Sequence, residues 1–98
     1  MTTPNSAATD ASSRYEIFYD HPACKVLDRL SQAQYEPIDE KIVGLSLNPR
    51  PHGYKQLHPR LYRVRVGDWR IIYVVDDDTK RVIIADVRRR GKDTYKSL

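Results

Sequence analysis

The sequence predicts a single α+β domain with the element order β-α-α-β-β-β. Three observations indicate this class. A short stretch of alternating apolar residues near the N-terminus is followed by two segments with apolar residues at helical spacing. The second half contains three segments of β-branched and aromatic residues that are separated by turn residues. We expect a small, mainly antiparallel sheet with the two N-terminal helices packed on one face.

The chain has 98 residues, which suits one hydrophobic core and is too short for two cores of ordinary size. Residues 1–13 are small and polar, so we expect a disordered extension there and a single domain over residues 14–98. The lone Cys24 excludes an intramolecular disulfide and a cysteine-based zinc site. No apolar run approaches about 18 residues and no signal-peptide pattern is present, so we expect a cytoplasmic protein without membrane contact.

The first strand is predicted over residues 14–20, where every second residue from Tyr15 is apolar and should line a buried face. An amphipathic helix is predicted over about 22–34, because apolar residues recur there at helical spacing. Pro22 is tolerated in a first helical turn. Asp20, just before it, is expected to accept hydrogen bonds from the first backbone amides.

A second helix, antiparallel to the first, is predicted to start in the acidic stretch around Pro37 and to end at about Leu47. Acidic residues interact favourably with the N-terminus of a helix, and proline is tolerated in its first turn. Asn48 ends the helix, because the residue before a proline avoids helical backbone angles. The expected buried stripe consists of Ile38, Ile42 and Leu45, with Leu47 at its end.

The second half of the chain predicts a surface connection and three strands. Proline and glycine indicate an ordered connection over residues 50–59. The strands are expected at about 62–66, 69–76 and 81–87, with turns at Gly67-Asp68 and around residues 76–80.

The two-residue turn after Val66 fixes the register of the first hairpin, because it places Val66 opposite Trp69 and Arg65 opposite Arg70. Arg63 shares their face, which the helices leave uncovered. Six residues on the other face form the expected seat of the helices: Tyr62, Val64, Val66, Trp69, Ile71 and Tyr73. The hairpin therefore separates an apolar face from a cationic one.

Charge is divided unevenly along the chain. Residues 1–49 hold four Lys and Arg against seven Asp and Glu, whereas residues 50–98 hold thirteen against six. Opposed arginines destabilise a strand pair by up to about 1 kcal/mol, but guanidiniums bind phosphate oxygens well. We expect a surface for a polyanion such as nucleic acid. Asp86, the acidic loop at 76–78 or residues after the last strand could instead neutralise the arginines as ion pairs.

The C-terminal tail adds cations to the end of the last strand. Arg88, Arg89, Arg90 and Lys92 precede Tyr95, which could stack on a base, donate to a phosphate or act as a general base. The alternative is a solvated terminus or a nonspecific nucleic-acid arm. His52 and His58 are expected on the surface. No carboxylate cluster suits magnesium, so we expect no metal and no cofactor.

Four segments of the chain form a recognisable set: LNP at 47–49, KQL at 55–57, YRVRVGDWRIIYVV at 62–75 and VRRRGKDTY ending at Tyr95. With these segments the sequence resembles the RelE family of toxin components of toxin-antitoxin systems, within the RelE/ParE superfamily. The resemblance implies an mRNA endoribonuclease that acts in the ribosomal A site and inhibits translation. It also implies a cognate antitoxin that wraps the toxin, with operator DNA contacted only through that complex.

The resemblance also implies roles for individual residues. Arg63 and Arg65 would hold substrate phosphates, and Arg70 would stabilise the scissile phosphate. Arg89 or Arg90 would oppose the leaving oxygen, although the choice among the three consecutive arginines stays open. Further expected roles are catalysis by Tyr95, through stacking or deprotonation, and RNA binding by Arg88, Lys92 and Lys55. Relatives often carry lysine at positions 63 and 65, so a lysine base has no candidate there.

Two other functions are consistent with the sequence. The ParE branch shares the fold and the antitoxin but inhibits DNA gyrase, and the arginine-rich tail with Tyr95 favours RNA cleavage over this function. A non-catalytic module would use the basic sheet only to bind RNA or an acidic antitoxin segment.

Overall fold

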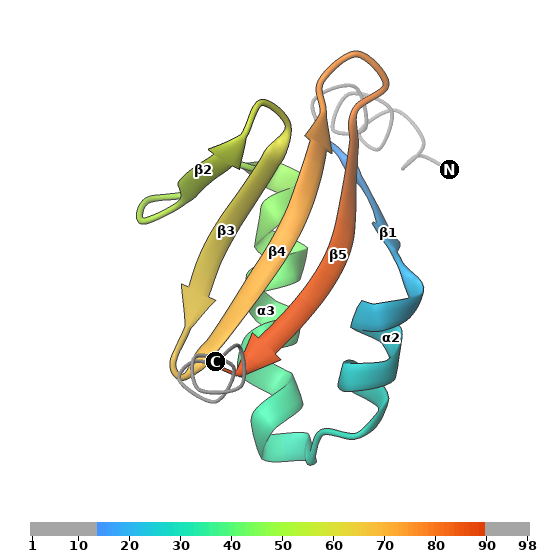
Figure 1. The fold of residues 1–98 in the computed structure, drawn as a ribbon, viewed down its shortest axis with the longest axis vertical. Helices are drawn as coiled ribbons and strands as arrows, with labels where there is room; N and C mark the ends of the chain where they lie inside the picture. The colour runs from blue at the N-terminus through green and yellow to red at the C-terminus, as the bar shows by residue number, and fades with distance from the viewer. Residues whose placement is uncertain (1–13, 90–98) are drawn as a thin grey trace, which may run out of the picture.

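The structure, a computed structural model, describes residues 14–89. Its elements in chain order are β1 (Glu16–Tyr19), α2 (His21–Asp28), α3 (Gln32–Leu47), β2 (Lys55–His58), β3 (Leu61–Val66), β4 (Trp69–Asp76) and β5 (Arg81–Arg89) (Figure 1). The predicted α+β class with two N-terminal helices on one face of the sheet is confirmed, with one strand more than expected. The predicted extension at residues 1–13 lies outside the described residues.

The five strands form one sheet in the order β1-β5-β4-β3-β2. The pairs from β2 to β5 are antiparallel, and β1 is parallel to β5. Figure 1 shows α3 running behind the middle strands, in the direction opposite to α2, as predicted. Both helices contribute to one core with the sheet, so the other sheet face carries no helix among the described residues.

The core lies between the helices and the inner face of the sheet. Its buried residues are Ala23, Ile38, Ile42, Leu45, Tyr62, Val64, Ile71, Tyr73, Val75, Val82, Ile84 and Val87. The hydroxyl of fully buried Tyr73 donates to the carbonyl oxygen of Pro49 at 2.7 Å, which satisfies both groups. Burial raises the pKa of Tyr73 above its ordinary value. The predicted helix-facing set on β3 and β4 is confirmed, with Val66 and Trp69 at its half-buried end.

The helix boundaries differ from the prediction. The first helix ends at Asp28 rather than near residue 34, and the second begins at Gln32, so that Pro37 lies inside it. The reason is a capping box: the Ser31 hydroxyl accepts from the Gln34 amide at 3.2 Å, and the Gln34 side chain accepts from the Ser31 amide at 3.1 Å. The sequence SQAQ at residues 31–34 contains the Ser-x-x-Gln pattern of a capping box. The expected cap by the Asp20 side chain is absent, since only its carbonyl accepts.

Both edge strands correct the prediction. The connection over 50–59 contains a strand, β2, whose four residues are all exposed. Its pairing with β3 orders it, although it buries no side chain and so leaves no periodic signal. At the other edge, the predicted buried face of β1 is only partly buried: Ile17 packs half-buried against the core, whereas Phe18 and Tyr19 are 40% and 41% exposed. Within residues 14–89, no helix is long and apolar enough to cross a membrane.

A register shift in β5 determines which of its side chains face the core. Ile72 pairs with Asp86, but Tyr73 pairs with Ile84, so Ala85 is an extra residue, a β-bulge. Val82 and Ile84 are buried before the bulge, and Val87 is buried after it, so the core-facing positions change from even to odd numbers. Asp86 and Arg88 are therefore turned away from the helices.

Candidate functional site

Three arginines on adjacent strands form one row across the outer face of the sheet. Arg65 of β3 lies opposite Arg70 of β4, and Arg70 lies opposite Arg88 of β5. Adjacent strands are about 4.8 Å apart, so the three side chains leave the sheet close together. We call Arg65, Arg70 and Arg88 the arginine row. The predicted pairing of Arg65 with Arg70 is confirmed, and the structure adds Arg88.

A second row lies beside the arginine row, farther from the Gly67 turn. Arg63 pairs with Lys55 on one side and with Ile72 on the other, and Ile72 pairs with Asp86. Lys55 therefore extends the cationic face to the edge strand β2. The structure thus brings two of the predicted RNA-binding residues, Arg63 and Lys55, next to the arginine row.

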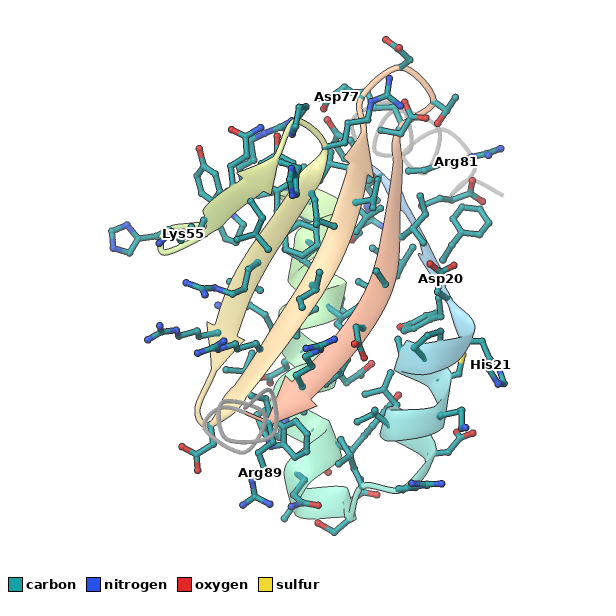
Figure 2. All side chains as sticks on the ribbon, viewed as in Figure 1. Asp20, His21, Lys55, Asp77, Arg81 and Arg89 are labelled. Carbon is teal, nitrogen blue, oxygen red and sulfur yellow. The ribbon has the colours of Figure 1, made fainter. Side chains whose placement is uncertain are left out.

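Carboxylates neutralise this face only in part. The acidic loop does not reach it, because Asp77 pairs instead with Arg50 at 2.8 Å at the opposite end of the sheet (Figure 2). Asp86 accepts from Arg88 Nε at 2.9 Å. Within residues 14–89, Arg65 and Arg70 form no ion pair. Counted over the described residues, the face therefore carries a net positive charge.

Arg70 is the half-buried centre of the row. Its Nε is buried and has no hydrogen-bond partner among the described residues. A buried donor without a partner costs about 1–3 kcal/mol, and like charges on the neighbouring strands add to that cost. Such local costs are typical of functional sites. An anion bound over the row would offset the electrostatic part.

Arg89, one of the predicted catalytic residues, lies on the other face. It pairs opposite Trp69, and its guanidinium carbon is 5.6 Å from the centroid of the Trp69 ring. The bulge at Ala85 is the cause, since it exchanges the faces of the residues that follow it. Among the described arginines of the C-terminal run, Arg88 is therefore the one that joins Arg70.

The remaining predicted site residues, Arg90, Lys92 and Tyr95, lie outside the described residues. Their roles stay predictions. Figure 2 shows Arg89 at the end of β5 far from Asp77, so the chain leaves the sheet at the end where the arginine row lies.

The described residues offer no evident metal site. No group of three or more His, Cys, Asp or Glu within residues 14–89 could hold a metal ion. His52 and His58 are exposed, in the turn before β2 and at the end of β2. The cations that the strands place on the outer face can bind phosphate and stabilise negative charge that develops on it.

Asp86 is the site residue whose place the sequence analysis missed. The sequence offers Asp86 as an alternative partner that neutralises the arginines, and its ion pair with Arg88 confirms this for one of them. The structure adds the hydrogen bond that Asp86 accepts from the Val87 amide. A signal was present in RVIIADV, because alternation continued from Val82 and Ile84 would bury a carboxylate at position 86. A charged residue at an expected core position indicates a bulge.

Comparison with known proteins identifies the family of the chain and relatives with the same fold. A family model described as "ParE toxin of type II toxin-antitoxin system, parDE" matches residues 11–94. No curated protein sequence matches the chain.

Several solved structures have the same fold. The archaeal RelE–RelB complex from Pyrococcus horikoshii is 28% identical with a TM-score of 0.70, covering 81% of this chain and 98% of that one. The toxin-antitoxin complex RelBE2 from Mycobacterium tuberculosis is 25% identical with a TM-score of 0.68, covering 79% and 99%. The isolated E. coli RelE toxin, at 22% identity, a TM-score of 0.70 and coverage of 86% and 99%, supports the fold alone.

Proposed function

Because this chain belongs to the RelE/ParE family of toxins of type II toxin-antitoxin systems, we propose that it is an mRNA endoribonuclease that inhibits translation on the ribosome. The arginine row is the observation that carries the proposal. Three guanidiniums on a sheet face that no helix covers within residues 14–89, with Arg63 and Lys55 beside them, suit the backbone of a single-stranded RNA.

The proposed reaction is attack by a ribose 2′-hydroxyl on the adjacent phosphate. A bond forms from the 2′-oxygen to phosphorus, and the bond from phosphorus to the 5′-oxygen breaks, which leaves a cyclic phosphate and a 5′-hydroxyl. The 2′ proton passes to a general base, for which Tyr95 is the candidate, and the 5′-oxygen takes a proton from solvent. The added negative charge of the transition state would meet cations that are already in place.

The arginine row suggests a division of roles. Arg70, at the centre and half-buried, would bind the scissile phosphate. Arg88, on the neighbouring strand, would stabilise charge on the leaving oxygen, the role expected for Arg89 or Arg90 from the sequence. Arg65, Arg63 and Lys55 would hold the flanking phosphates, since they continue the cationic face toward β2.

An antitoxin is the proposed protein partner. Two of the similar structures are complexes of a toxin with its antitoxin. In this chain the cationic face would attract an acidic polypeptide. The exposed edge strand β2 could pair with an added strand of that polypeptide.

Inhibition of DNA gyrase is the second candidate, because the matching family model is that of the ParE toxins. A supercoiling assay with purified gyrase distinguishes the two functions. Inhibition at stoichiometric toxin, without cleavage of translated mRNA, would favour gyrase.

Mapping of mRNA 5′ ends after a short induction tests the ribonuclease proposal. New ends inside translated frames are expected with the wild-type chain and should be absent with Arg70→Ala. Arg81→Ala is the matched control, because Arg81 lies at the opposite end of β5, over the Phe18 ring. Growth arrest without new 5′ ends would contradict the proposal. A non-catalytic module would bind RNA and produce no ends with any variant.

A further inference from the structure

A carboxylate lies inside the cationic face of the sheet. Asp86 is opposite Ile72, two residues along the strands from the pair formed by Arg70 and Arg88 and on the same face. Its side chain is 25% exposed. A negative charge at this place weakens the attraction of the face for a phosphate. Attraction of a phosphate to the face therefore does not explain why a carboxylate lies there.

Both carboxylate oxygens of Asp86 are used within β5. Oδ1 accepts from the Val87 amide at 2.8 Å, and Oδ2 accepts from Arg88 Nε at 2.9 Å. The amide belongs to the residue that returns to the core after the bulge. The backbone bond therefore fixes the carboxylate, and the fixed carboxylate holds an arginine side chain that is itself 54% exposed.

An arginine on a strand surface has many rotamers, and ordering it when a ligand binds costs conformational entropy. A bond to Nε limits the directions available to the outer guanidinium nitrogens before the ligand arrives. Because Arg88 lies opposite Arg70, such a restraint favours a geometry in which both guanidiniums contact one anion.

We propose that Asp86 is a positioning residue that holds Arg88 beside Arg70 for joint binding of one RNA phosphate. The identity of the anion rests on the proposed function, whereas the coupling between Asp86 and Arg88 does not require cleavage. Simple electrostatics predicts tighter RNA binding when the Asp86 charge is lost, and the proposal predicts the opposite. Loss of the Asp86 charge should weaken RNA binding, although it makes the face more positive.

A double-mutant cycle with Asp86→Ala, Arg88→Ala and the double variant tests the proposal. The binding probe is a fluorescent single-stranded RNA oligonucleotide with 2′-O-methyl riboses, which lacks the attacking hydroxyl. Asp86→Ala should weaken binding about threefold to tenfold, in line with lost preorganisation. In the Arg88→Ala background the same change should leave binding unchanged or tighten it, because only the charge effect remains.

Asp78→Ala is the charge-matched control, since Asp78 is exposed in the turn between β4 and β5, at the other end of these strands. It should leave binding unchanged or tighten it slightly. Asp86→Asn is the second variant if Asp86→Ala does not fold, as thermal unfolding would show. Asn keeps an acceptor but loses the charge, so binding should fall between wild type and Arg88→Ala.

Three results would overturn the proposal. The first is tighter RNA binding by Asp86→Ala, or by Asp86→Asn if only that variant folds, which is the effect expected of a change in charge alone. The change at position 86 could weaken binding equally with and without Arg88. The wild-type protein could also fail to bind the oligonucleotide, which would show that the arginine row does not bind a phosphate of this RNA. Binding by the wild type without cleavage on programmed ribosomes would contradict the proposed function alone, and the cycle would still measure the coupling.

Discussion

Arg50 forms a bidentate ion pair with Asp77, from Nη2 to Oδ2 at 2.8 Å and from Nη1 to Oδ1 at 3.3 Å. The pair joins the loop after α3 to the turn between β4 and β5. Tyr15, just before β1, donates its hydroxyl to the same carboxylate at 2.6 Å. These contacts lie at the end of the sheet opposite the arginine row and connect three separate parts of the chain (Figure 2).

Asp77→Ala should lower the free energy of unfolding by about 1 kcal/mol at neutral pH, because the pair is partly exposed. The hydrogen bonds from Arg50, and next that from Tyr15, lower the pKa of Asp77 below its ordinary value of 3.8. The native state thus binds this proton less readily than the unfolded state. The contribution is present above the ordinary pKa and is lost as pH falls through the folded one.

Urea unfolding at neutral pH and at about pH 2 measures this effect. The difference between wild type and Asp77→Ala should shrink at the lower pH. Asp78→Ala serves as the control for a nearby exposed carboxylate. A difference that does not change with pH would contradict an ionic origin.

Tyr73→Phe should destabilise the fold by about 1–2 kcal/mol. The change removes the 2.7 Å bond to the Pro49 carbonyl and leaves that buried acceptor unpaired. The aromatic ring, and hence the core packing, is retained. Chemical denaturation measures the loss, and Tyr54→Phe, at an exposed tyrosine, is the control. Equal stability of the two variants would show that the bond contributes little.

Arg70→Met should abolish toxicity and raise the free energy of unfolding by about 0.5–1 kcal/mol. Methionine removes both the unpaired Nε and a positive charge that faces Arg65 and Arg88. Part of the gain should disappear at high salt, which screens the repulsion. Arg81→Met is the control. A destabilised but still toxic Arg70→Met variant would contradict this account of the arginine row.

Gly44→Ala should stabilise the protein by about 0.5–1 kcal/mol. Gly44 lies in the interior of α3, where glycine costs backbone entropy, and a Cβ there would meet nothing within 4 Å. Gly67→Ala should have the opposite effect, because Gly67 has a φ of +58° in the hairpin turn. Thermal unfolding of both variants gives the comparison. A stability change of the same sign in both variants would contradict this explanation.

The sequence predicted the hairpin best, because its information is local. The turn at Gly67 fixes the register, and alternation from Val66 and Trp69 then places Arg65 and Arg70 on one face. The sequence predicted β1, β2 and the break between the helices less well. The edge strands bury few or no side chains, and the Ser31 capping box lies inside a stretch whose apolar spacing suits a single helix.

The sequence by itself determined the α+β class, the apolar face of the hairpin and the excess of cations on the other face. Among the described residues, the tertiary structure alone decided that Arg88, and not Arg89, joins them. Val82 and Ile84 pack on the inner face of β5, and the bulge at Ala85 lets Val87 join them, which turns Arg88 outward and Arg89 toward Trp69. Alternation is a property of one strand, whereas a bulge depends on what a strand pairs with and packs against.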